Sequence, residues 1–296
     1  ARSPLVMPQM NTAFWTALVV ICVAMGGLAL FMSTGGRVFV PTGGPNTFGR
    51  NMGLAGVGAI YLAARSGATV RAASVGVVAM ALMSVVMCGS RGGLLAAIVA
   101  TGILVVSARM RWHTKAAVLG IFAVVGAAAF TFTSAGKNAL LVFQHRILHQ
   151  TVEQRYLAAR DDLFIEAWEL AWQRPWTGWG LNGFLAQSWN YPHNIFLEAF
   201  VEGGALSLAM LLAIFVAWWT YFRKIRVPVP RIELAAISLV LTSAQVSGDF
   251  YDSRGVFLII ALSAPTLAIL DRAPVPRGQR LAGPGVALPR STSLVT

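Results

Sequence analysis

This chain has few charged residues, and its first five apolar segments contain no Asp or Glu. Of its 296 residues, 11% are charged and 56% are hydrophobic, whereas soluble domains carry about 25% charged residues. The deficit excludes an ordinary soluble domain and is typical of a polytopic membrane protein. The shortage of carboxylates within the membrane argues against a proton- or cation-coupled transporter, which needs them there.

Cysteine and other metal ligands are also scarce. The two cysteines, Cys22 and Cys88, lie inside apolar segments, where a cysteine usually serves as a small buried hydrophobe. His145 and His149 are one helical turn apart, but no acidic or cysteine partner stands at ligand spacing. We therefore expect no disulfide framework, no metal site and no cofactor.

Eight apolar segments are long enough to cross about 30 Å of hydrocarbon as helices. They cover residues 13–33, 48–64, 72–88, 92–108, 116–133, 195–222, 232–248 and 255–270. We predict an all-α polytopic membrane protein with about eight transmembrane helices. Its parts are five N-terminal spans (1–133), a long and partly helical loop (134–194), three C-terminal spans (195–272) and a disordered cytoplasmic tail (273–296). The second segment is rich in glycine, which permits close helix packing.

The net charge of +12 comes mostly from Lys and Arg in the short links between these segments. Links rich in positive charge stay in the cytoplasm, and one alternate set of links is the richer. That set holds Arg65, Arg71, Arg109, Arg111, Lys115, Arg223, Lys224, Arg226 and Arg231. Both termini are then inside, and the loop 134–194 faces the periplasm of a bacterial inner membrane. No basic run carries interleaved aromatics, which excludes nucleic acid as a partner.

Within the loop, one stretch predicts a helix that lies in the membrane interface. Its apolar residues recur at helical spacing, and Pro175 and Gly178 end the pattern. Tryptophans favour the boundary between lipid and water. The face and its flank comprise Phe164, Ala167, Trp168, Ala171, Trp172, Trp176 and Trp179.

Three arginines are candidates for binding a phosphate group. Arg91 lies between two apolar segments with almost no loop, and ionisable residues at such depth are costly and tend to be functional; the alternative is an arginine that extends to the interface. Arg155 and Arg160 belong to the loop helix and, taken alone, indicate a solvated polar face. Together with Arg91 they would suit a diphosphate, because guanidinium groups donate in pairs to phosphate oxygens.

His193 follows Pro192 and opens the sixth span, where Asn194 is placed to cap the helix. A neutral imidazole can accept a proton from a hydroxyl group. On spacing alone, a structural histidine is the alternative.

Three sequence blocks resemble the O-antigen ligase and polymerase family of bacterial inner membranes. They are GSRGG at 89–93, RDDLF at 160–164 with RPWTGWGLNGF at 174–184, and YPHNIFLEAFVEGG at 191–204. The ligase pattern continues from His193 and Asn194 through nine residues to Gly204. Ser207 stands where Gly, Thr or Tyr is usual, a departure that bears on the ligase assignment. A weaker match is SGDFYDSRG at 247–255. The family has more spans than this chain offers, so we expect that its earliest spans are absent.

The resemblance implies a metal-independent glycosyltransferase with its active site on the periplasmic face. The donor would be a glycan on undecaprenyl diphosphate, and the acceptor a sugar hydroxyl of lipid A–core. His193 would be the base, and Arg91 and Arg160 would bind the diphosphate, with Arg155 as a substitute for Arg160. Supporting residues would be Tyr191, Asn194, Glu198, Glu202 and Gly204. The alternatives are a polymerase that extends lipid-linked repeat units, a protein O-oligosaccharyltransferase, and a transporter of lipid-linked saccharides.

Overall fold

The computed structural model describes residues 6–32, 37–38, 44–107, 111–113, 116, 120, 131, 134–145, 148–149, 160–224, 230–247 and 252–262. Within these ranges every regular element is a helix, as predicted. The helices are α1 (Val6–Phe31), α2 (Gly44–Ala63), α3 (Ala68–Met87), α4 (Arg91–Ser107), α6 (Ser134–Phe143), α7 (Arg160–Gln173), α8 (Gly183–Ser188), α9 (Ile195–Lys224) and α10 (Pro230–Ala244). Residues 252–262 are also helical.

Among the residues that the structure describes, three stretches of helix are long and apolar enough to cross a membrane: Asn11–Phe31, Ala68–Met87 and Ile195–Arg223. Arg91–Ser107 and Ile232–Ala244 are apolar but shorter. The chain is thus a membrane protein, while the predicted total of eight spans stays a prediction. Nearly all of the predicted span 116–133, residues 263–270 of the last predicted span and the whole tail 273–296 lie outside the described residues.

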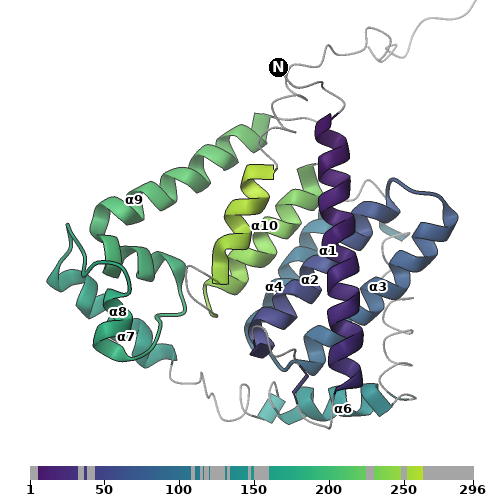
Figure 1. Ribbon diagram of the computed structural model, residues 1–296, viewed down its shortest axis with the longest axis horizontal. Helices are drawn as coiled ribbons and strands as arrows, with labels where there is room; N and C mark the ends of the chain where they lie inside the picture. The colour runs from purple at the N-terminus through teal and green to yellow at the C-terminus, as the bar shows by residue number, and fades with distance from the viewer. Residues whose placement is uncertain are drawn as a thin grey trace, which may run out of the picture.

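Helix α2 occupies the centre of the bundle and packs against α1, α3, α4 and α10 (Figure 1). It is long enough to span but rich in glycine, and most of its residues from Phe48 to Tyr61 are buried. A Cβ on Gly49 would collide with Cys88, one on Gly53 with Leu239, and one on Gly58 with Trp15. These close approaches confirm that the glycines permit close helix packing.

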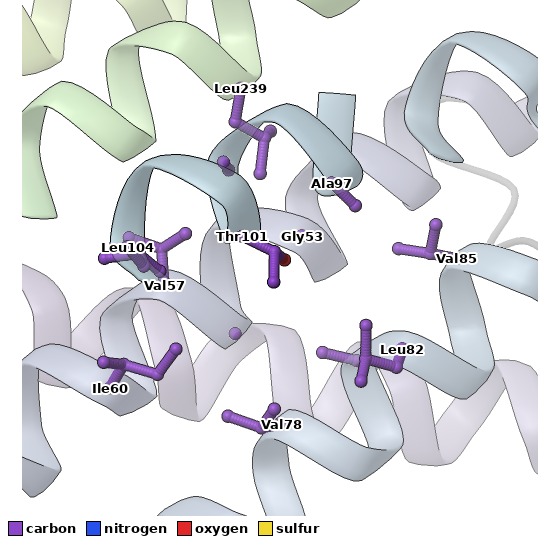
Figure 2. Close-up of a pocket in the computed structure, with 13 residues that line it drawn as sticks. Gly53, Val57, Ile60, Val78, Leu82, Val85, Ala97, Thr101, Leu104 and Leu239 are labelled. Carbon is purple, nitrogen blue, oxygen red and sulfur yellow. The ribbon is translucent and has the colours of Figure 1, made fainter. Parts of the chain in front are cut away.

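A small apolar cavity of about 50 Å³ lies where α2, α3 and α4 meet. Figure 2 shows Leu239 of α10 extending toward it, with Leu82 and Val85 on the α3 side. Thr101 is the one polar side chain among the residues that line it. None of the predicted site residues borders this cavity, so we treat it as a gap in the packing.

The helices of the segment 134–194 lie at one end of the molecule. Figure 1 shows α6, α7 and α8 at the end opposite to the start of α1. The predicted loop is therefore partly helical. The assignment of this end to the periplasm is a prediction that the fold does not test.

Candidate functional site

Helix α9 is broken at Gly204, where the backbone has φ 67° and ψ −165°. The sequence predicted an uninterrupted helix over 195–222, so the kink is a difference from prediction. A positive φ of this kind suits glycine because other residues carry a Cβ that clashes. The break removes helical hydrogen bonds on both sides of Gly204, and the freed backbone groups need other partners.

The glycine-rich turn before α8 supplies those partners. Trp179 N donates to the carbonyl oxygen of Val201 (2.8 Å), and Gly180 N donates to that of Glu202 (2.9 Å). In return, Ala205 N donates to the carbonyl oxygen of Pro175 (2.7 Å). We name this arrangement, formed by residues 175–180 and 201–205, the turn–kink junction. It ties the loop segment to the N-terminal third of α9 through backbone groups alone.

The turn and the kinked part of α9 meet at the junction with no space between them for side chains. Gly178 has φ +65°, and a Cβ there would overlap the carbonyl group of Glu202. A Cβ on Gly204 would overlap the carbonyl group of Trp176. A Cβ on the neighbouring Gly203 would collide with the side chain of Ser207, the residue that departs from the ligase pattern. Backbone contact therefore requires glycine at 178 and 204.

Helix α7 packs on the N-terminal part of α9 beside this junction. Ala167 and Ala171 are fully buried against Phe200 and its neighbours. Trp168 and Trp172 make edge-to-face contacts with Phe200, at ring-centroid distances of 6.1 and 5.7 Å, and remain about half exposed. The predicted apolar face thus divides into small residues against α9 and tryptophans turned outward.

The side chain of Trp179 attaches the turn to α7. Its indole Nε1 donates to the carbonyl oxygen of Leu170 (2.9 Å). The guanidinium of Arg174 lies 4.1 Å from the centre of its ring, a cation–π contact. The turn therefore has side-chain anchors on α7 and backbone anchors on α9.

His193 stands just before α9 with φ 54°, in the left-handed region. Residues other than glycine are uncommon there, and such strain gathers at functional sites. Asn194 caps the helix, as predicted: its Oδ1 accepts hydrogen bonds from Phe196 N (3.0 Å) and Leu197 N (3.1 Å). The cap fixes the direction in which α9 leaves the half-buried histidine.

The other predicted supporting residues surround this start of α9. Tyr191 is half-buried, and its backbone N bonds to Asn190 Oδ1 at 2.9 Å. Glu198, in the first turn of α9, is buried with 4% of its surface exposed. Glu202 is half-buried and belongs to the turn–kink junction, as does Gly204.

Arg91 is the first residue of α4, and the turn before it is well fixed. Ser90 Oγ caps this helix by accepting a hydrogen bond from Gly93 N (3.1 Å). The short segment 37–38 lies against the same turn. Arg37 Nε donates to the carbonyl oxygen of Cys88 (2.8 Å), and Val38 N donates to that of Met87 (3.1 Å). Arg37 is therefore held close to Arg91.

Arg160 is the first residue of α7, and it shares a pocket with Arg91. The pocket measures about 250 Å³, and Asp161, Phe164 and Val246 complete much of its wall. Burial lowers the pKa of the Arg160 guanidinium, and the positive charges of Arg91 and Arg37 lower it further. The fold thus gathers three cationic side chains from distant parts of the sequence.

The helix geometry makes this pocket favourable for an anion. The N-terminus of a helix carries a partial positive charge, which disfavours a cation and attracts a phosphate. Arg91 stands at such an N-terminus, that of α4. Asp161 is the one acidic side chain among the lining residues. The three arginines outweigh it, so the local charge is positive.

The structure does not test two further predictions, the role of Arg155 and independence from a metal ion. Arg155 is outside the described residues. Among the residues described, no group of three or more His, Cys, Asp or Glu side chains lies close enough to hold a metal ion. The rings of His145 and His149 are 6.2 Å apart. Metal independence stays a prediction.

His193 does not line the pocket of Arg91 and Arg160; the end of α10 connects the two regions. Val246, just after α10, forms part of the pocket wall. Ile195 and Phe196, which directly follow His193 and its neighbour, pack in one cluster with Leu241 and Ala244 of α10. The candidate base and the arginine pocket therefore flank the same helix end.

The sequence reasoning found Arg91 and Arg160 but missed Arg37. The available signal was its place in a link predicted to lie on the same side of the membrane as Arg91. The contact with Cys88 that brings it to the site leaves no pattern in the sequence.

Comparison with known proteins adds one match. Residues 75–212 match the family model described as O-Antigen ligase. That stretch includes Arg91, Arg160, the turn–kink junction and His193. A search of curated proteins finds no match to the chain.

Proposed function

Since residues 75–212 belong to the O-antigen ligase family, we propose that this chain is a ligase-like glycosyltransferase of the bacterial inner membrane. It moves a glycan from undecaprenyl diphosphate to a sugar hydroxyl of lipid A–core on the periplasmic face. The family supports the coarser statement, a ligase- or polymerase-like glycosyltransferase in a membrane. The observation that carries the finer proposal is the pocket shared by Arg91 and Arg160.

The arginine pocket binds the diphosphate of the donor. Arg91 and Arg160 donate to its oxygens, and Arg37 adds a third positive charge beside them. Arg155 is the remaining candidate ligand. The leaving diphosphate carries its own negative charge, so it needs electrostatic stabilisation more than protonation. Fixed guanidinium groups and the N-terminus of α4 provide this without a metal ion.

His193 acts as the base toward the acceptor. The acceptor oxygen attacks the anomeric carbon, and a new C–O bond forms as the bond from that carbon to the diphosphate oxygen breaks. The hydroxyl proton passes to a ring nitrogen of His193. The cap by Asn194 and the turn–kink junction hold the start of α9 in place, which matters because a small misplacement of a catalytic group costs rate.

The exposed tryptophans face the lipid. Trp168, Trp172 and Trp176 expose 51%, 57% and 78% of their surfaces, all on α7 or directly after it. Tryptophan prefers the interface between headgroups and acyl chains. We propose that this side of the loop segment lies in the outer interface and aligns the lipid-linked donor with the pocket.

A defined transfer reaction tests the proposal. The purified chain is incubated in liposomes with an undecaprenyl-diphosphate-linked glycan and lipid A–core, and the products are separated by gel and mass. Glycan on lipid A–core is expected, and His193→Ala should abolish it. Longer lipid-linked glycans would instead indicate a polymerase, and glycan on an added protein acceptor a protein O-oligosaccharyltransferase. Movement of the donor across the bilayer with no transfer would indicate a transporter.

A further inference from the structure

A second polar pocket lies at the other side of the end of α10. It measures about 420 Å³, larger than the arginine pocket, and the two share no lining residue. Its polar wall comprises Thr47, Arg50 and Asn51 of α2 with Asp252 and Arg254, and Val240 of α10 adds an apolar side. None of these residues has a role in the donor site or in base catalysis as proposed above.

Arg50 is a buried charged residue in the wall of this pocket. Its side chain is 3% exposed, although the other buried residues of α2 are glycines, apolar residues and Tyr61. Its Nη2 lies 3.8 Å from Asp252 Oδ2 and 3.5 Å from Thr47 Oγ1. Burying an ion pair often stabilises a protein less than an apolar contact of the same size would. The charges at this pocket are therefore better explained by what the pocket binds than by packing.

The end of α10 places the pocket beside the reacting groups. Val240 lines the second pocket, Leu241 and Ala244 pack with Ile195 next to His193 and its cap, and Val246 lines the arginine pocket. Phe257, from the helix that carries Asp252 and Arg254, joins the same cluster as Ile195. Ile195, two residues after the candidate base, thus packs against the stretch of α10 whose ends border the two pockets.

The pocket's chemistry fits a sugar that carries negative charge. Two guanidinium groups meet one carboxylate, so the lining residues bear net positive charge. The amide of Asn51, the hydroxyl of Thr47 and the carboxylate of Asp252 supply donors and acceptors for sugar hydroxyls. Arginine recognises phosphate and carboxylate groups by paired hydrogen bonds.

We propose that this second pocket binds the acceptor saccharide through a phosphate or carboxylate group on it. The inference rests on the transferase function proposed above, and assigns to its acceptor a place distinct from the donor's. Arg254 and Arg50 hold the anionic group, while Asp252 keeps Arg50 oriented and accepts from sugar hydroxyls.

Direct binding measurements test this without requiring transfer. The full chain carrying His193→Ala is titrated with purified lipid A–core and, separately, with inorganic diphosphate. Arg254→Ala should weaken lipid A–core binding about tenfold or more, the loss of a charge-assisted contact, and leave diphosphate binding unchanged. Arg91→Ala should do the reverse. Lipid A–core treated with phosphatase separates a phosphate contact, which weakens with treatment, from a carboxylate contact, which does not.

Exchanging the charges of Arg50 and Asp252 distinguishes a role in acceptor binding from a purely structural role. If Arg50 and Asp252 only join two helices, each single variant Arg50→Asp or Asp252→Arg should lose stability and acceptor binding. The double variant should then recover both the melting temperature and the acceptor affinity. The proposal expects recovery of the melting temperature alone. Unchanged acceptor binding in Arg254→Ala, or recovered binding in the exchanged variant, overturns it. Absence of transfer by the unmutated chain, with lipid A–core still bound at Arg254, would refute the transferase function and not this pocket.

Discussion

Gly204 of α9 lies directly against the carbonyl group of Trp176, with no space between them for a side chain. The contact joins the N-terminal third of a long helix to a turn that is separated from it along the chain by one element, α8. Together with Gly178 against Glu202, it holds the start of α9, and hence His193, against α7.

Replacing Gly204 with alanine should destabilise the protein strongly. The left-handed backbone costs roughly 1–3 kcal/mol for a residue with a Cβ, and the overlap with Trp176 adds to it. We expect a lower melting temperature in detergent. The measurement is size-exclusion chromatography of the protein after heating. Gly102→Ala is the matched control, because a Cβ there meets nothing within 4 Å in the middle of α4. Equal melting temperatures for the two variants would show that the junction does not matter to stability.

Arg37→Ala should weaken the binding of inorganic diphosphate. Loss of one hydrogen bond to a charged group costs about 1.5–3 kcal/mol, or roughly tenfold to a hundredfold in affinity. Diphosphate should also raise the melting temperature of the unmutated chain, since it binds the folded protein and relieves the repulsion of Arg160 by Arg91 and Arg37. Arg65→Ala serves as control, because Arg65 stacks on Tyr61 and does not line the arginine pocket. Equal affinities in both variants would remove Arg37 from the site.

His193→Asn should lower the transfer rate about a hundredfold to ten-thousandfold while leaving the protein folded. Asparagine tolerates the left-handed backbone found at this position better than alanine does. The unmutated enzyme should lose activity at acidic pH, because protonated imidazole accepts no further proton. The variant's residual rate should lack this loss. An asparagine variant with normal rate and normal pH dependence would exclude histidine as the base.

Asn194→Ala should lower stability by about 1 kcal/mol, the usual cost of losing a helix cap. Two backbone donors, Phe196 N and Leu197 N, lose their partner. Because the cap adjoins His193, the transfer rate should fall with little change in the concentration of diphosphate needed for half-saturation. Asn194→Asp keeps the cap and should restore both properties. A loss of rate that aspartate does not restore would assign Asn194 a role beyond capping.

Transfer should continue after treatment with a chelator. The arginines of the pocket and the N-terminus of α4 supply the positive charge that a divalent cation would otherwise provide. The test compares rates before and after incubation with excess EDTA. Loss of activity that Mg²⁺ or Mn²⁺ restores would contradict this prediction.

Hydrophobic length alone predicted most of the helices. The segments predicted at 72–88 and 92–108 correspond to α3 at 68–87 and α4 at 91–107. The kink in α9 was missed because apolar residues continue at helical spacing across Gly204. Its hydrogen bonds join backbone groups, which every residue has except for the N–H that proline lacks, so they leave no pattern of side chains to read.

The chemistry of the candidate site was partly visible in the sequence. Arginines are costly near hydrocarbon, which singled out Arg91, and Arg160 followed once a diphosphate partner was considered. The fold then placed both in one pocket. Arg37 and Arg50 could not be identified, because their positions depend on contacts with Cys88 and Asp252 that join distant parts of the chain.

The contacts that hold the turn–kink junction together do not depend on the side chains that face outward from it. Its three hydrogen bonds between the turn and α9 use main-chain atoms, and its close contacts need only glycine at 178 and 204. The side chains that point outward from the same residues, such as that of Trp176, are not needed for the junction to form. Mutation can therefore alter the exposed surface of this turn while the backbone frame before and after His193 stays intact.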